Sequence, residues 1–173
     1  MPSNEPGRTV LITGATDGIG LALAHRYARQ GDRLVLIGRR PLDDLDATFF
    51  SSENYCQVDL ADADCAETIE RWLGDRQISR IDRLVHNAGV GYVGPIGEQT
   101  SESIDQLIAV NLKAPLAVTH ALLPLVEAGD GKLIYVSSVA SVLPGPDYAV
   151  YSATKAALDG FVRNFQIELA AAD

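Results

Sequence analysis

The sequence predicts a doubly wound α/β fold, with a parallel sheet of at least five strands and helices on both faces. Three observations predict it. Short runs rich in valine, isoleucine and leucine alternate with longer segments of helical spacing, the first run leads into a glycine-rich turn, and no linker or repeat divides the chain. Parallel strands need right-handed crossovers, so ligands are expected beyond the carboxyl ends of the strands.

Each expected strand is a short apolar run, and the five runs are residues 9–13, 33–37, 55–58, 83–86 and 132–136. The expected helices are residues 19–29, 42–49, 62–73, 101–126 and 151–171. Gly31 follows the first helix, and Pro115 is expected to interrupt the fourth because proline lacks a backbone N–H. Residues 1–7, MPSNEPG, are expected to form a flexible tail before a single domain, residues 8–173.

The composition is that of a soluble globular protein, with 173 residues, 47% hydrophobic and 21% charged. A formal charge of −9 and the lack of a lysine/arginine run argue against a nucleic-acid partner. No signal peptide or uninterrupted apolar run of the roughly 20 residues that span a bilayer is seen, so we expect a cytoplasmic protein without a membrane partner. Cysteines and histidines do not follow metal-ligand spacing, and no metal is expected: Cys56, Cys65, His25, His86, His120.

The first expected strand runs directly into TGATDGIG, which places Gly14, Gly18 and Gly20 at the start of the first helix. Glycine permits a positive φ and a close approach of a phosphate to the main chain, and the free N–H groups of a helix start favour negative charge. The turn therefore predicts a dinucleotide pyrophosphate site. By itself it would also fit a tight connection without a ligand, but no lysine follows it as a triphosphate-binding loop would need.

The spacing GxxxGxG resembles the glycine motif of the short-chain dehydrogenase/reductase family. Asp59, which follows the third expected strand, stands where that family holds the adenine ring, and HNAG resembles the family's NAG element beside the cofactor ribose. The resemblance implies a Rossmann-like fold and the following cofactor-binding residues: Gly14, Thr16, Asp17, Gly18, Ile19, Gly20, Arg39, Asp59, Leu60, Asn87, Ala88, Gly89, Tyr151 and Lys155.

The resemblance extends to a catalytic set, Asn111, Ser138, Tyr151 and Lys155, in which YSATK follows the serine at the family's spacing. Tyr151 and Lys155 are four residues apart and share one helical face. A phenol titrates near pH 10, and a neighbouring ammonium stabilises its phenolate, so the pair suits proton exchange with a carbonyl or alcohol oxygen. Ser138 would hold that oxygen, and the family assigns Asn111 to a water linked to the lysine. In isolation, the pair would also fit a solvated helix face.

The end of the second expected strand, LIGRR, favours NADP(H) over NAD(H). Gly38 stands where NAD-dependent members of the family usually carry an acid, and Arg39 matches the arginine of many NADP-dependent members. Two alternatives stay open: that Arg39 and Arg40 are ordinary exposed residues, and that Asp17 opposes NADP, since some NADP-preferring relatives carry a basic residue there.

The resemblance stops before the family's last two strands, so the fifth strand is expected to be a bare edge that needs another chain or the rest of a longer one. The family resemblance implies a small carbonyl or alcohol substrate and a homo-oligomer, a dimer or a tetramer. Apolar residues around the expected reaction site favour a moderately hydrophobic ketone or aldehyde. The alternatives are a catalytically silent nucleotide-binding or regulatory protein and, ranked last, an epimerase or dehydratase of a nucleotide sugar.

Overall fold

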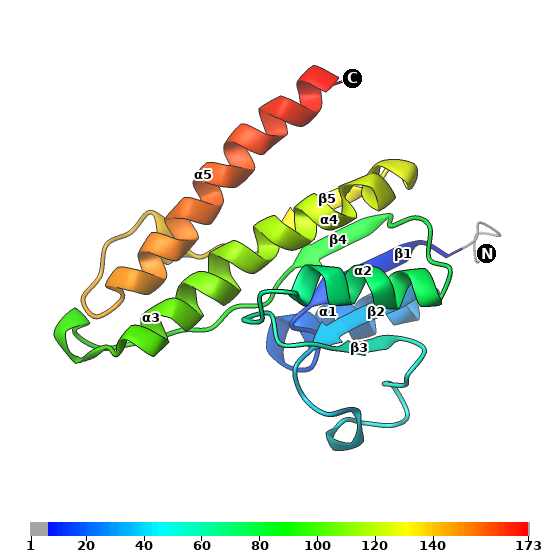
Figure 1. The fold of residues 1–173 in the computed structure, drawn as a ribbon, viewed down its shortest axis with the longest axis horizontal. Helices are drawn as coiled ribbons and strands as arrows, with labels where there is room; N and C mark the ends of the chain where they lie inside the picture. The colour runs from blue at the N-terminus through cyan, green and yellow to red at the C-terminus, as the bar shows by residue number, and fades with distance from the viewer. Residues whose placement is uncertain (1–6, 173) are drawn as a thin grey trace.

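Five parallel strands form the sheet at the centre of the computed structural model, which describes residues 7–172 (Figure 1). The strands lie in the order β3-β2-β1-β4-β5. Their bounds are β1 (Thr9–Thr13), β2 (Arg33–Gly38), β3 (Tyr55–Gln57), β4 (Arg83–His86) and β5 (Lys132–Tyr135). All five expected strands are thus present, with ends that differ by one residue at most, and strand order reverses direction between β1 and β4. Ligand sites of such sheets lie at this reversal.

Helices cover both faces of the sheet. The α-helices are α1 (Gly18–Arg29), α2 (Cys65–Asp75), α3 (Ser101–Ile108), α4 (Ala114–Ala128) and α5 (Ala149–Ala172), and short 3-10 helices are η1 (Leu42–Asp44), η2 (Ile96–Glu98) and η4 (Val139–Ser141). The predicted doubly wound α/β fold is confirmed. The expected tail, residues 1–7, lies outside the described residues except for Gly7.

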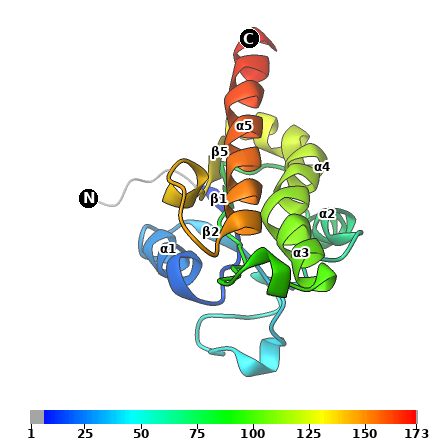
Figure 2. The same cartoon turned by 90° about the vertical axis from the view of Figure 1, so that its left-hand side faces the viewer.

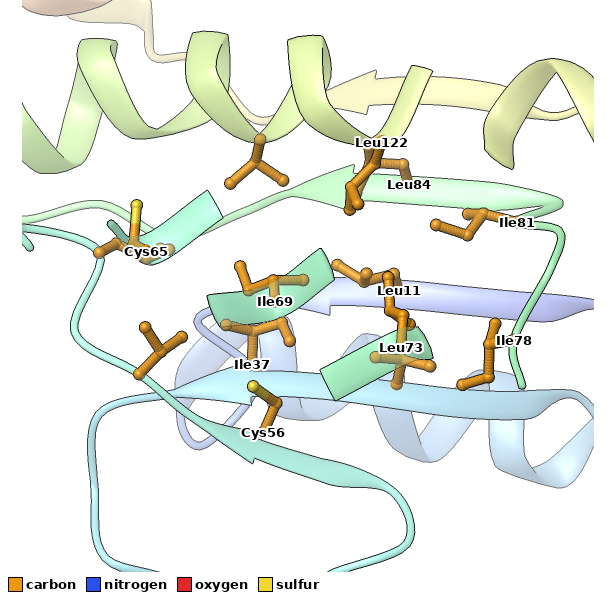
Figure 3. Close-up of a cluster of buried hydrophobic side chains, with 14 of the residues drawn as sticks. Leu11, Ile37, Cys56, Cys65, Ile69, Leu73, Ile78, Ile81, Leu84 and Leu122 are labelled. Atoms are coloured by element: carbon orange, nitrogen blue, oxygen red, sulfur yellow. The ribbon is translucent and has the colours of Figure 1, made fainter. Parts of the chain in front are cut away.

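Alternate residues of the central strands enter two separate cores, because successive side chains of a strand point to opposite faces. Leu11 packs with Ile69 of α2 and Leu122 of α4 on one face (Figure 3), whereas Val10 and Ala24 belong to the cluster around α1 on the other. All of these side chains are buried. The two cores hold the sheet rigid and so fix where the strand ends lie.

The expected helix at residues 42–49 is wrong, because only the short 3-10 helix η1 forms there. Asp46 prevents continuation: its carboxylate accepts hydrogen bonds from both the N–H and the hydroxyl of Thr48, at 2.9 and 2.7 Å. Such local bonds compete with a helical backbone and favour turns.

The expected interruption at Pro115 is replaced by a π-helical turn, η3 (Ala109–Lys113), which joins α3 to α4 without a break. The amide of Ala114 bonds to the carbonyl of Ala109, five residues back. Pro115 has no N–H for the carbonyl of Asn111, and the wider turn accommodates this loss. The combined helix is long and apolar enough to pass a composition test for a membrane span, but α4 packs on α2 and the sheet, as the core helix of a globular domain does.

The outer edge of β5 pairs with no strand within residues 7–172. The second half of α5 projects away from the sheet (Figures 1 and 2), and a groove of about 820 Å³ lies between α4, β5 and α5. Only the first half of α5 is anchored, through contacts with α3, η3 and η4 and through the buried Leu158.

Candidate functional site

At the start of α1, the turn after β1 forms a cradle whose main chain is left open by its glycines. Gly14 and Gly18 have φ angles of 66° and 53°, a region that other residues rarely adopt. A Cβ on Gly14 would lie 2.8 Å from the Cα of Ala88, and one on Gly20 would collide with the carbonyl oxygen of Gly14. Asp17 caps α1, since its carboxylate accepts a 2.7 Å hydrogen bond from Gly18 N. Strand, turn and helix therefore meet at a close-packed point that only glycine permits.

A cavity of about 570 Å³ opens over this cradle at the carboxyl ends of β1, β2 and β4. Eleven of the predicted cofactor-binding residues line it: Gly14, Thr16, Asp17, Gly18, Ile19, Arg39, Asp59, Leu60, Asn87, Ala88 and Gly89. Gly20 is buried beneath them. An exposed glycine turn, a helix N-terminus and an elongated cavity fit a dinucleotide, with the pyrophosphate at the glycines.

Asn87 ties the two central strands together. Its Nδ2 donates to the carbonyl oxygens of Thr13 and Gly14, both at 3.1 Å. In return, Thr13 Oγ1 accepts hydrogen bonds from the N–H groups of Asn87 and Ala88, also at 3.1 Å. These four bonds close the sheet at the reversal of strand order and hold the cradle in its conformation.

At the other end of the cavity, Arg39 and Asp59 face one another across its mouth. Arg39 Nη1 lies 3.9 Å from Asp59 Oδ2, with 61% of the arginine side chain exposed. An exposed pair at this distance contributes little free energy, so the guanidinium remains available to another anion.

A second cavity of about 380 Å³ adjoins the first and shares Ile19, Asn87, Gly89 and Val90 with it. Tyr151 and Lys155 of α5 line it together with Tyr148, whose ring centroid lies 6.4 Å from that of Tyr151. The helix start at Ala149 sets both side chains on the face directed at this cavity. The predicted pair is thus brought next to the predicted cofactor cavity.

Lys155 is 4% exposed, and its Nζ donates a 3.0 Å hydrogen bond to the carbonyl oxygen of Val136. Burial lowers the pKa of its ammonium, and the negative charge of Asp159 opposes that shift. A Cβ on Gly89 would lie 3.4 Å from Asn111 Oδ1 and 3.5 Å from Lys155 Nζ, so both groups border the same glycine.

Asn111 lies in the π-turn and is almost fully buried. Its Oδ1 accepts from Val90 N at 2.8 Å and its Nδ2 donates to Val90 O at 2.9 Å and to Thr154 Oγ1 at 3.3 Å. The amide therefore clamps the loop after β4 to α5, a role that the sequence did not reveal. The role in holding a water stays a prediction.

Ser138 lies beside the second cavity but caps η4, where its Oγ accepts a 3.2 Å hydrogen bond from Ala140 N. The neighbouring Ser137 lines the cavity instead, and its buried Oγ has no hydrogen-bond partner within residues 7–172. Sequence reasoning did not select Ser137. The only available signal was the doubled serine of YVSS, from which the family spacing selects the second.

Comparison with known proteins finds short-chain dehydrogenases and reductases by both sequence and structure. The family model described as short chain dehydrogenase matches residues 8–173. Human dehydrogenase/reductase SDR family member 4 is 34% identical over 169 residues, which are 94% of this chain and 61% of the relative. The crystal structure of a short-chain dehydrogenase from Streptomyces avermitilis superposes with a TM-score of 0.86 at 32% identity, covering 97% of this chain and 62% of that one.

A metagenomic short-chain oxidoreductase solved in complex with NADP is 34% identical, with a TM-score of 0.83, and the match covers 95% of this chain and 77% of that one. The chain spans less than two thirds of the length of the human relative. Cradle, strand order and matched residues agree: the chain belongs to the short-chain dehydrogenase/reductase family and has its Rossmann-like fold.

Proposed function

We propose that the protein is an NADP(H)-dependent oxidoreductase that interconverts a carbonyl and an alcohol. The observation that carries the proposal is the junction of the two cavities. The glycine cradle lies in one, Tyr151 and Lys155 line the other, and Asn87 and Gly89 line both. A dinucleotide lying along the first cavity would direct its reactive ring toward the tyrosine.

The bound nicotinamide would supply or accept the hydride. The phenol of Tyr151 would give its proton to the carbonyl oxygen during reduction and take it back during oxidation. Lys155 would stabilise the phenolate, and its bond to the carbonyl oxygen of Val136 would hold the ammonium at the cavity. The Oγ of Ser138 accepts from Ala140, which leaves its proton free to be donated to the substrate oxygen.

The preference for NADP(H) is supported by the surroundings of the adenosine end. Arg39 and Arg40 line the cavity there beside Gly38, and guanidinium groups suit a 2′-phosphate. The related metagenomic oxidoreductase was solved in complex with NADP and a Brucella ovis oxidoreductase with NAD, so the choice rests on the two arginines of this chain. Residue 17 is an acid that caps α1, and it supplies no positive charge to the cavity. Binding of the 2′-phosphate would therefore depend on the two arginines.

The second cavity supports a moderately hydrophobic ketone or aldehyde as substrate. Val90, Val93 and Tyr148 line it, and Lys155 is its only charged lining residue within the described part of the chain. A cytoplasmic location and a homo-oligomer, a dimer or a tetramer, belong to the same proposal, the oligomer because family members commonly associate.

The proposal is tested by following NADPH and NADH absorbance with a panel of ketones and aldehydes, using the unaltered protein, Tyr151→Phe, and Tyr27→Phe as a matched control. Tyr27 belongs to α1, packs against the core on that face of the sheet and lines neither cavity. Reduction that is lost in Tyr151→Phe, with cofactor binding kept, is the expected result. Equal turnover in the unaltered protein and Tyr151→Phe would contradict the role of the phenol. Cofactor binding without turnover on any substrate would instead favour a silent nucleotide-binding protein.

A further inference from the structure

The space beside Gly38 is closed, although this is the position from which an acid would recognise the cofactor ribose. A Cβ built on Gly38 would lie 2.7 Å from Thr16 Cγ2 and 3.0 Å from Tyr55 Oη. Both neighbours belong to other elements: Thr16 to the glycine turn after β1, and Tyr55 to β3. Any side chain at residue 38 must therefore displace one of them.

Tyr55 cannot move aside easily. It is 3% exposed, and the ring of Phe50 meets it edge-on with centroids 5.6 Å apart. Its hydroxyl donates a 2.7 Å hydrogen bond to the carbonyl oxygen of Arg40. Burial raises the pKa of the phenol to about 12, so the hydroxyl keeps its proton and remains a donor. The ring therefore lies as a fixed neighbour behind Gly38, the residue that itself lines the cavity.

The bond to Arg40 also fixes the main chain that carries both cavity arginines. Arg40 reaches back to the carbonyl oxygen of Asp44 at 3.0 Å, and Arg39 is held only by its exposed 3.9 Å pair with Asp59. Exposed contacts of this kind restrain a side chain weakly, so the backbone sets the position from which each guanidinium reaches an anion. The hydroxyl of Tyr55 is the buried anchor of that backbone.

We propose that Tyr55, together with Thr16, determines cofactor selectivity by two actions: it excludes an acidic side chain from residue 38, and it orients the Arg39–Arg40 segment toward a 2′-phosphate. The inference rests on the proposed function, because it assumes that the first cavity binds the adenosine half of the dinucleotide. An acid at residue 38 would bind the ribose hydroxyls of NAD and repel a 2′-phosphate. Because no side chain fits at residue 38, this mode of binding NAD is excluded. Tyr55 acts through other residues and is a positioning residue.

The first test removes the hydroxyl alone. Dissociation constants of NADP⁺ and NAD⁺ are measured by calorimetry on the full chain, for the unaltered protein and Tyr55→Phe. Losing one neutral hydrogen bond predicts NADP⁺ binding weaker by roughly three- to tenfold, with NAD⁺ binding unchanged. Tyr135→Phe is the matched control, since it also loses a hydroxyl bond, to Thr119, but lies on β5, at the opposite edge of the sheet from Tyr55 on β3. Equal weakening of both cofactors in Tyr55→Phe would show a merely structural role and overturn the inference.

The second test enlarges the space beside Gly38. Gly38→Asp alone is expected to weaken NADP⁺ without improving NAD⁺, because the new Cβ has no room. Gly38→Asp combined with Thr16→Ser and Tyr55→Phe removes the two nearest atoms, Thr16 Cγ2 and Tyr55 Oη, and leaves only the 3.3 Å contact with the ring. The triple variant is expected to bind NAD⁺ at least about tenfold better than Gly38→Asp, the effect of one charge-assisted bond.

A gain in NAD⁺ binding by Gly38→Asp alone would overturn the inference, because the closed space would then not limit the cofactor. The two proposals fail differently. If the unaltered chain binds neither dinucleotide, the proposed function fails and the inference falls with it. If it prefers NADP⁺ and Tyr55→Phe keeps that preference in full, the inference alone fails.

Discussion

Acidification is expected to destabilise the fold through His86, the last residue of β4 and the neighbour of Asn87. His86 is 4% exposed, its ring stacks on Tyr135 with centroids 4.7 Å apart, and its Nε2 lies 2.9 Å from Thr119 Oγ1. Thr119 Oγ1 is in turn 2.7 Å from the hydroxyl of Tyr135. No carboxylate faces the ring in this network. Burial lowers the pKa of His86 from 6.5 to about 3, so the folded protein holds it neutral.

The sign and size of the effect follow from this difference in pKa. Because the folded pKa lies below the unfolded value, the stabilisation is complete above pH 6.5 and is lost as pH falls toward 3. Each pH unit well below 6.5 corresponds to about 1.4 kcal/mol, and the loss between pH 7 and pH 5 is about 2 kcal/mol. A typical domain has a total stability of about 5–15 kcal/mol, so the loss is measurable.

The assay is urea unfolding at pH 7, 6 and 5 for the unaltered protein and His86→Phe, which keeps a ring against Tyr135. The difference in free energy of unfolding between the two proteins should fall by about 2 kcal/mol from pH 7 to pH 5. His120→Phe, at an exposed position of α4, controls for the loss of one histidine. A difference between unaltered protein and His86→Phe that stays constant with pH would refute the reasoning.

Two further predictions concern the glycine cradle and the π-turn. Gly18→Ala should cost about 1–2 kcal/mol in the free energy of unfolding, because its φ is positive but no described atom lies within 4 Å of a new Cβ. Gly14→Ala should cost more and abolish dinucleotide binding, since it adds the contact with Ala88; equal losses in both variants by urea unfolding and calorimetry would contradict this. Asn111→Leu leaves the N–H and C=O of Val90 unpaired and should cost about 2–4 kcal/mol, whereas an unchanged unfolding midpoint would contradict the clamp.

The sequence predicted the five strands because the strands of a parallel sheet read as short, continuous apolar runs, and such a run is local. It predicted the cofactor cradle for a similar reason, since the φ angles of the glycine turn belong to neighbouring residues. It failed at residues 42–49, where a single carboxylate, that of Asp46, outweighs helical spacing. It also failed to foresee the π-turn around Asn111, by which the helix continues although Pro115 has no N–H for the carbonyl of Asn111.

By itself, then, the sequence determined the strand segments, the glycine turn and the position of Tyr151 and Lys155 on one helical face. Each of these depends on residues that lie close together in the chain. Only the tertiary structure decided that Ser137 lines the second cavity while Ser138 caps η4, and that Tyr55 and Thr16 close the space at Gly38. These contacts join residues far apart in the chain, and their distances are set by packing of the whole sheet and its helices.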